Sequence, residues 1–369
     1  MSQPPKRFRR LVIKVGSSVL AQASGTPRLD AFHALATQLA ACARQSCEVV
    51  VVSSGAIACG MAVLGLTRRP KELAQLQACA AIGQGQLMRL YSEACARCGL
   101  TVAQVLLTEA DLSNAGRCRN ARRTLEALLA RRVVPIVNEN DTVAVDEITF
   151  GDNDRLAALV ASLIRADLLM MLSDVDGLLR DGRVVERLDD LNQTHDALAK
   201  PTGRSTTKGG MLSKLSAARI ARHAGIPMVI ANGHRDKVVL DILAGQPIGT
   251  LIPPPAARLS SRKWWIAFSV RKPQGTLVVD DGAAEALHRH ASLLASGIQA
   301  VAGRFHAGDS VAIVTARQEE IARGISSFSS GELLRIRGLK THEIASILGV
   351  ANAKEVVHRD QLVLMKEAA

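Results

Sequence analysis

The segment that decides the fold joins an apolar stretch, Val133-Val-Pro-Ile-Val137, to two polar clusters, Asn138-Glu-Asn-Asp141 and Gly151-Asp-Asn-Asp154. The apolar stretch has the length of a buried strand. After the second cluster, apolar residues recur every three or four positions over 156–164, which predicts an amphipathic helix. The clusters therefore lie where a strand ends and a helix begins, and open α/β sheets bind ligands there.

Asn, Asp and Gly are also ordinary turn residues, so a capped loop is the simpler interpretation of either cluster alone. Two such clusters close together favour a small-molecule site. The predicted helix start adds free N–H groups that suit an anion, with Asp152 or Asn153 as its cap.

Two strands nearer the N-terminus end in glycine and small hydroxyl residues. Leu11–Val15 precedes Gly16-Ser-Ser18, and Glu48–Val52 precedes Ser53-Ser-Gly55. Burying Lys14 in a strand is costly unless its ammonium meets an anion, although a solvated lysine on a surface strand is the alternative. Glycine lets backbone N–H groups approach a ligand closely. We expect phosphate near Lys14 and a ligand at Ser54.

An apolar strand followed by small polar residues occurs again towards the C-terminus, where the stretch Leu168–Leu172 ends in Ser173-Asp174. A basic, hydroxyl-rich loop over 202–211 then leads into a predicted helix over 211–223, with Lys214 in its first turn. A lysine at the positive end of a helix is unfavourable unless it meets an anion. We therefore favour a nucleotide-binding loop over a solvated one.

Strands and helices alternate until the three prolines at 253–255, which predicts a mostly parallel open sheet sandwiched by helices. Short strands and turns follow. We expect an α/β domain at 1–255, a linker at 256–272 and a small, mostly β domain at 273–369.

The composition is that of a globular chain of 369 residues, with 48% hydrophobic and 22% charged residues. No apolar run reaches the ~18–20 residues of a membrane span, and the N-terminus lacks a secretory pattern, so we expect a cytoplasmic protein. The net charge of +12 fits nucleic-acid contact, acidic substrates or an arginine-rich composition equally well. The seven cysteines are irregularly spaced, which favours reduced thiols over a zinc site.

These strand ends offer cations, carboxylates and glycine loops, without a Ser–His–Asp set or metal-ligand spacing. That inventory suits phosphoryl transfer, in which positioning and charge stabilisation carry most of the catalysis. A carboxylate acceptor, with a pKa of ~4.3, is already ionised at neutral pH and needs no general base.

The motifs also resemble a known family, the glutamate 5-kinases of the amino-acid kinase superfamily. The matching stretches run in family order: Val12–Val19, Ser53–Ile57, Asn138–Asp141, Gly151–Asp154, Ser173–Leu178 and Gly209–Lys214. The C-terminal region resembles a PUA domain, a small mostly-β barrel, through Val279–Ala283, Gly297-Ile298, Gly303–Asp309 and Ala322–Gly324.

This resemblance implies transfer of the γ-phosphoryl group of ATP to the side-chain carboxylate of L-glutamate, the first step of proline biosynthesis. Lys14 and Lys214 would hold the phosphates, and Asp154 would orient both lysines. The implied ATP-binding residues are Lys14, Ser173, Asp174, Lys208, Gly209, Gly210, Met211, Leu212, Ser213 and Lys214. The implied glutamate-binding residues are Ser54, Gly55, Asn138, Asp141 and Asn153.

The resemblance further implies Mg²⁺ bound with ATP rather than in a protein metal site. It implies feedback inhibition by proline, a homo-oligomer (dimer or tetramer) and a glutamyl-phosphate reductase as partner. RNA binding by the PUA-like domain stays open. Two departures concern the nucleotide side: Lys208 stands where the family usually has threonine, and the segment 178–188 looks shorter than the common form. We expect Lys208 to add a phosphate contact.

Two rival interpretations remain. A sister kinase acting on acetylglutamate, aspartate or uridylate would share the fold, although the PUA-like region and Gly151–Asp154 favour glutamate. An RNA-binding or RNA-modifying protein would fit the charge, but one tyrosine and six phenylalanines offer few surfaces on which bases could stack.

Overall fold

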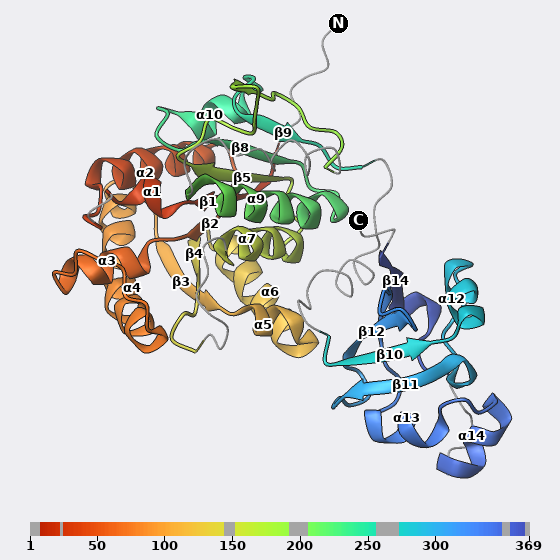
Figure 1. Cartoon of the computed structure of the whole chain (residues 1–369). Coiled ribbons are helices and arrows are strands. Elements are labelled where there is room, and N and C mark those ends of the chain that lie inside the picture. Colours follow the sequence, from red (N-terminus) through yellow and green to blue (C-terminus); the bar gives the residue numbers. More distant parts are fainter. Residues whose placement is uncertain are drawn as a thin grey trace, which may run out of the picture. The chain divides into compact units, whose positions relative to one another are not determined.

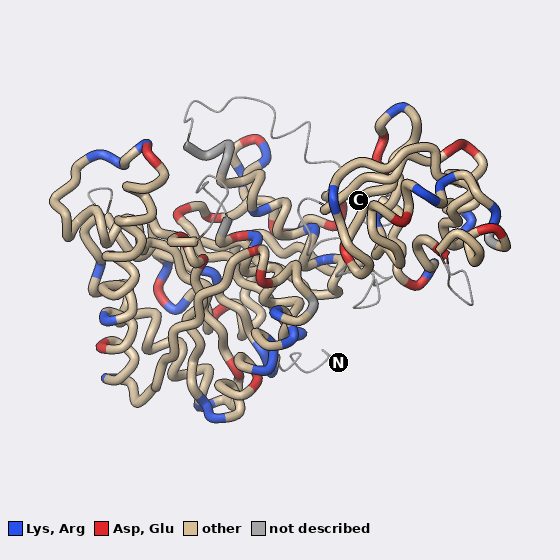
Figure 2. Tube along the Cα trace, turned by 90° about the horizontal axis from the view of Figure 1, so that it is seen from below, with Lys and Arg blue, Asp and Glu red and all other residues tan. Residues whose placement is uncertain are grey.

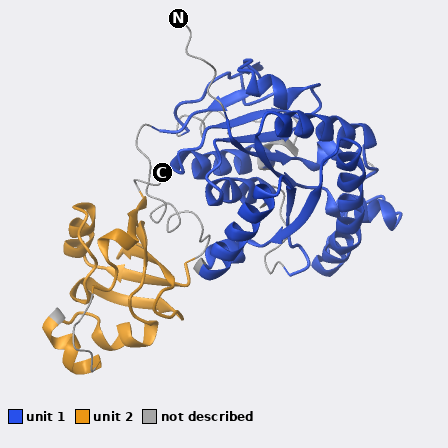
Figure 3. Cartoon of the chain, turned by 180° about the vertical axis from the view of Figure 1, so that it is seen from behind, with its two compact units in different colours: residues 1–258 blue, residues 259–369 orange. Residues whose placement is uncertain are grey.

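The chain forms two compact units, residues 1–258 and 259–369, in a computed structural model (Figure 3). The structure describes residues 8–22, 25–143, 152–191, 206–255, 273–348 and 355–365. The expected linker at 256–272 lies outside these residues.

The first unit is built on a seven-stranded sheet with the order β3-β4-β2-β1-β5-β8-β9 (Figure 1). Every neighbouring pair is parallel except β8 and β9, which are antiparallel. The sheet is therefore mostly parallel, as predicted. Its strands are β1 (Arg10–Val15), β2 (Glu48–Ser53), β3 (Val102–Leu107), β4 (Val134–Glu139), β5 (Leu168–Ser173), β8 (Met228–Asn232) and β9 (Thr250–Ile252).

Helices cover both faces of this sheet (Figure 1). One face packs against α2 (Leu29–Arg44), α4 (Leu73–Ala96) and α10 (Val238–Leu243). The other lies against α6 (Ala115–Ala130), α7 (Asp152–Leu163) and α9 (Thr206–His223). Because side chains alternate along a strand, Leu11, Ile13 and Val15 enter the α2 core, and Lys14 lies on the α7 side.

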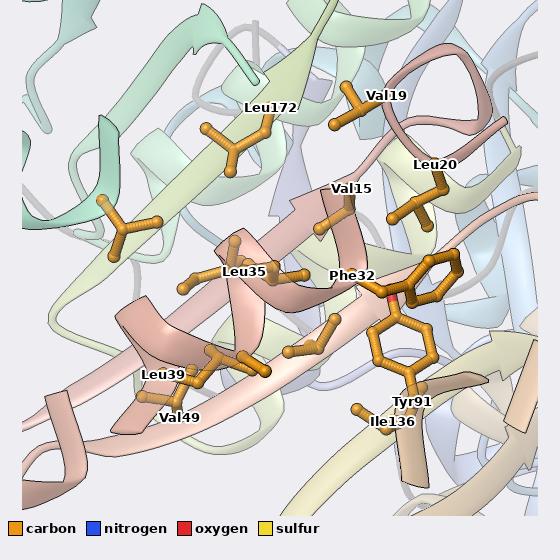
Figure 4. Close-up of a cluster of buried hydrophobic side chains, with 14 of the residues drawn as sticks. Val15, Val19, Leu20, Phe32, Leu35, Leu39, Val49, Tyr91, Ile136 and Leu172 are labelled. Atoms are coloured by element: carbon orange, nitrogen blue, oxygen red, sulfur yellow. The ribbon is translucent and has the colours of Figure 1, made fainter. Parts of the chain in front are cut away.

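The core beneath α2 and α4 is aliphatic, with one aromatic pair (Figure 4). The rings of Phe32 and Tyr91 meet edge to face, with their centroids 4.9 Å apart. The buried Tyr91 hydroxyl lies 2.9 Å from the Ser53 hydroxyl. This hydrogen bond ties α4 to the end of β2, just before Ser54.

The short helix α3 (Ala56–Val63) packs against α4 almost backbone to backbone. A Cβ added at Gly60 would lie 1.8 Å from the Cys79 carbonyl oxygen, and one at Gly83 would lie 1.8 Å from the Ala56 carbonyl oxygen. Side chains other than hydrogen would push the two helices apart. Gly60 and Gly83 thus permit the close contact between the two helices.

Some elements differ from the sequence expectations. The helix predicted at 211–223 begins at Thr206, which places Lys214 in its third turn and not its first. The strand β9 and the hairpin of β6 (Leu179–Arg180) and β7 (Arg183–Val184) were not expected. Two further short helices are α1 (Ser17–Leu20) and α5 (Glu109–Ser113).

The second unit contains a five-stranded sheet with the order β11-β10-β12-β13-β14. Its strands are β10 (Gly275–Val279), β11 (Ile298–Gly303), β12 (Ser310–Thr315), β13 (Glu320–Ile325) and β14 (Leu362–Leu364). The helices are α12 (Asp281–His288), α13 (Ser330–Ile336) and α14 (Thr341–Leu348), with 3₁₀ turns at Ala295–Gly297 and Arg359–Gln361. Its own apolar core includes Leu277, Phe305, Ile313 and Leu333.

Candidate active site

Three buried charges meet where β1 ends and α7 begins. The Lys14 Nζ lies 2.6 Å from Asp154 Oδ1, and the Lys214 Nζ lies 3.3 Å from Asp154 Oδ2. The residues are 7%, 8% and 1% exposed for Lys14, Lys214 and Asp154. The Ser213 hydroxyl donates to Asp154 Oδ2 at 2.7 Å, and Lys214 also donates to the Gly210 carbonyl at 3.2 Å. One carboxylate thus orients two ammonium groups that are 200 positions apart in the chain.

The electrostatics of this cluster favour an anionic ligand. Burial lowers the pKa of Lys14, and Lys214 adds to that effect, whereas Asp154 opposes it. Burial by itself would raise the pKa of Asp154, but Lys14 and Lys214 outweigh it, so the pKa of Asp154 is lowered. With all three groups ionised, their charges sum to +1. A buried surplus charge is costly unless an anion arrives to offset it.

Beside the charges, a chain of side-chain amides crosses from α7 to α4. The Asn153 Nδ2 donates to Ser54 Oγ at 3.2 Å and to Asn138 Oδ1 at 3.1 Å. The Asn138 Nδ2 donates in turn to Gln84 Oε1 at 2.8 Å. Two buried atoms of this chain, Asn153 Oδ1 and Gln84 Nε2, have no hydrogen-bond partner among the described residues. They can serve a ligand as acceptor and donor, respectively.

A cavity of about 310 Å³ opens next to the amide chain. Residues from α4, β3 and the end of β4 line it, including Ala80, Gln84, Leu106, Asn140, Asp141 and Thr142. It therefore brings Asp141 to the same region as Gln84.

The ends of β5 and β8 form the opposite side of the site. The Ser173 hydroxyl is buried and has no hydrogen-bond partner in the described part of the chain. The exposed Asp174 lies close enough to raise the pKa of Lys14. The Gly16 N–H donates to the Leu172 carbonyl at 2.9 Å, so the loop after β1 is held against β5.

The structure brings together most of the predicted site residues. Lys14, Asp154 and Lys214 form one ion cluster, and Ser54, Asn138 and Asn153 form one hydrogen-bonded set. Asn153, expected as a helix cap, instead reaches β2 and β4 with its amide. Gly55 adopts a left-handed backbone, with a φ of 105°, immediately before α3.

The described part of the predicted nucleotide loop, residues 206–211, is helical and lies in the first half of α9. Gly210 accepts the Lys214 hydrogen bond, Met211 is partly buried and Leu212 is 52% exposed. Gly209 and Lys208 lie on the helix backbone, but the side chain of Lys208 lies outside what the structure describes, as does Gly151.

Sequence reasoning missed Gln84. The sequence feature that could have pointed to Gln84 is its position between Gly83 and Gly85, next to the close contact between α3 and α4. A glycine that lets α4 approach α3 also fixes where the next side chain of α4 lies.

The described residues contain no group of three or more His, Cys, Asp or Glu that could hold a metal ion. All seven cysteines are free, and burial raises the pKa of Cys42 to about 12 and of Cys59 and Cys95 to about 11. Among the described residues, no helix is both long enough and apolar enough to cross a membrane.

Comparison with known proteins gives two family matches. Residues 9–232 match the amino acid kinase family, and residues 275–348 match the PUA domain. The first match spans the whole ion cluster and amide chain.

Curated relatives match over nearly the whole length. A glutamate 5-kinase of Caldanaerobacter subterraneus is 46% identical over 97% of this chain and 98% of its own length. Glutamate 5-kinases of Streptomyces avermitilis and Salinispora arenicola are each 48% identical, over 97% of this chain and 97% and 98% of their own lengths. With both domains and their order matched, this chain belongs to the glutamate 5-kinase family within the amino acid kinases.

Proposed function

We propose that this protein transfers the γ-phosphoryl group of ATP to the side-chain carboxylate of L-glutamate, forming L-glutamyl 5-phosphate in the first step of proline biosynthesis. The observation that carries the proposal is the buried Lys14–Asp154–Lys214 cluster, whose surplus positive charge lies at the ends of parallel strands. The family membership supports it.

Asp154 holds the two ammonium groups so that they converge on the migrating phosphoryl group. Negative charge on that group spreads over its equatorial oxygens in the transition state. Ammonium groups fixed in advance stabilise this charge without reorganising, and the low local dielectric strengthens the effect. The role proposed for Asp154 is positioning, since both of its oxygens already face lysines.

Glutamate would bind through Ser54, Gly55, Asn138, Asp141 and Asn153. The Asn153 Oδ1 is a buried acceptor that suits the α-ammonium group of an amino acid. The acceptor carboxylate is ionised at neutral pH, so attack on phosphorus needs no general base.

ATP would bind on the β5 side through Lys14, Ser173, Asp174 and the segment 208–214. Magnesium takes one or two carboxylates and completes its shell with phosphate oxygens and water. Asp174 fits that need because it is exposed, close to Lys14 and not engaged by both lysines as Asp154 is. Bound with ATP, the ion would neutralise part of the phosphate charge.

The test is hydroxylamine trapping of the acyl phosphate from glutamate and ATP, with and without proline. Aspartate, acetylglutamate and UMP serve as competing substrates in the same assay. We expect the hydroxamate with glutamate alone and its suppression by proline. Turnover of another acceptor in place of glutamate would assign the chain to a sister activity.

The remaining expectations stay predictions. They are a cytoplasmic location, a homo-oligomer, proline inhibition, a reductase partner and RNA contact by the PUA domain. RNA binding that weakens steeply with salt, without ATP turnover, would favour the rival class.

A further inference from the structure

Gln84 lies at the end of the amide chain, and the direction of every hydrogen bond in that chain is fixed. The Glu139 backbone N–H can only donate, and it donates to Asn138 Oδ1 at 3.0 Å. The Asn138 Nδ2 must therefore face Gln84, which presents its oxygen at 2.8 Å. It follows that Gln84 Nε2 is the free end of the chain.

That free end is a buried donor without a partner in the described residues. A buried donor without a partner has lost its hydration without gaining a hydrogen bond, and a ligand that accepts from it would offset that cost. Gln84 also lines the cavity that contains Asp141, a residue proposed above for substrate binding. The Gln84 side chain therefore borders the region where an amino acid would bind.

Sheet order indicates which end of the amino acid it meets. Lys14 lies on β1, Ser54 follows β2, and Asn138 lies on β4, so the amide chain runs outward from the phosphate site. Neighbouring strands are ~4.8 Å apart, so β4, which carries Asn138, lies roughly 10 Å from β1, and Gln84 follows Asn138 through a hydrogen bond of 2.8 Å. A glutamate with its side-chain carboxylate at the phosphate would direct its α-carboxylate towards Gln84.

We propose that Gln84 is a further substrate-binding residue. Its Nε2 donates to the α-carboxylate of glutamate, and its Oε1 orients Asn138 and, through Asn138, Asn153. This inference rests on the proposed function.

Two substitutions separate the two ends of the side chain. Gln84→Glu keeps an acceptor for Asn138 but replaces the donor with a negative charge, whereas Gln84→Met removes both. We expect each to raise the KM for glutamate roughly 10- to 100-fold, Gln84→Glu at least as much as Gln84→Met, because a hydrogen bond to a charged group contributes about 1.5–3 kcal/mol. The KM for ATP should stay within about twofold.

The matched control is Gln75→Glu, which adds the same charge at an exposed position of the same helix, away from the residues that line the cavity. It should leave the KM for glutamate nearly unchanged. Thermal unfolding of each variant checks folding. Gln84→Asn, which shortens the side chain by one methylene, replaces any variant that does not fold and should raise the same KM.

A Gln84→Glu enzyme with the wild-type KM for glutamate would overturn the α-carboxylate contact. A wild-type KM in Gln84→Met would overturn both roles. If the wild-type protein forms no glutamyl hydroxamate, the proposed function fails, and this inference fails with it.

Discussion

At the scale of single residues, Asp154 determines the charge state of the site. Asp154→Asn preserves the shape but leaves two buried ammonium groups without their carboxylate. We expect kcat to fall about 100- to 1000-fold, the range for losing one preorganised electrostatic contact. Hydroxamate formation measures this loss. Asp236→Asn, at an exposed aspartate, is the control and should remain active.

The comparison of the wild type with Asp154→Asn also gives a prediction for the pH dependence of stability. Because the pKa of Asp154 is lowered from 3.8, its carboxylate stabilises the fold fully above pH 3.8, and this stabilisation disappears as the pH falls through its folded pKa. The difference in unfolding free energy between wild type and Asp154→Asn should therefore be largest near neutral pH and shrink below pH 3.8. Urea unfolding across pH measures it, and a difference independent of pH would contradict the ion-pair assignment.

Lys14 contributes a penalty to folding rather than a stabilisation, but its effect on stability changes with pH in the same direction as that of Asp154. The pKa of Lys14 is lowered from 10.5, chiefly by burial, so the unfolded chain binds its proton more readily. This penalty is present below the folded pKa and is relieved as the pH rises towards 10.5. Both effects therefore make the stability of this cluster rise with pH, that of Asp154 in the acid range and that of Lys14 as the pH approaches 10.5.

Lys208 stands where the resemblance to glutamate 5-kinases leads us to expect a threonine in the nucleotide loop. The α9 backbone places it in the first turn, where N–H groups point towards an anion. Lys208→Thr should raise the KM for ATP several-fold by removing a phosphate contact, while the KM for glutamate stays unchanged. An unaltered KM for ATP in Lys208→Thr would contradict the phosphate contact proposed for Lys208.

At the scale of elements, the contact between α3 and α4 positions Gln84 and the end of β2. Gly83→Ala would place a Cβ 1.8 Å from the Ala56 carbonyl oxygen, so the helices must separate. We expect a loss of about 1–3 kcal/mol in unfolding free energy and a raised KM for glutamate.

Gly85→Ala is the matched control on the same helix. A Cβ there meets nothing within 4 Å, so this variant should gain about 0.5–1 kcal/mol from lower chain entropy. Equal destabilisation by both variants would show that the close approach of the helices is not the cause.

The sequence predicted those elements whose pattern is local. The apolar stretch Leu168–Leu172 is enough to predict a strand, and the apolar repeat over 156–164 is enough to predict a helix. The start of α9 was misplaced because Gly209-Gly210 favours a loop, whereas the turn they belong to is held by Lys214 and Ser213 bonding to Gly210. The Gln84–Asn138 bond joins positions 54 apart, which no local pattern encodes.

At the scale of the whole molecule, the net charge of +12 does not identify the site. Lysine and arginine occur on both units, with aspartate and glutamate among them (Figure 2). Some of these opposite charges form ion pairs with each other, such as Arg10–Glu48 and Arg155–Glu109. The informative cations are Lys14 and Lys214, which are buried and converge on one carboxylate.

The two units have separate apolar cores, one around Leu39 and Val51 and the other around Leu277 and Phe305. Every described residue of the candidate site lies in the first unit. A chain ending at Arg258 should therefore fold and form glutamyl hydroxamate at a rate within a few-fold of the full protein. Asp154→Asn in the shortened chain is the negative control. A shortened chain that unfolds cooperatively yet is inactive would mean that the PUA domain contributes to catalysis.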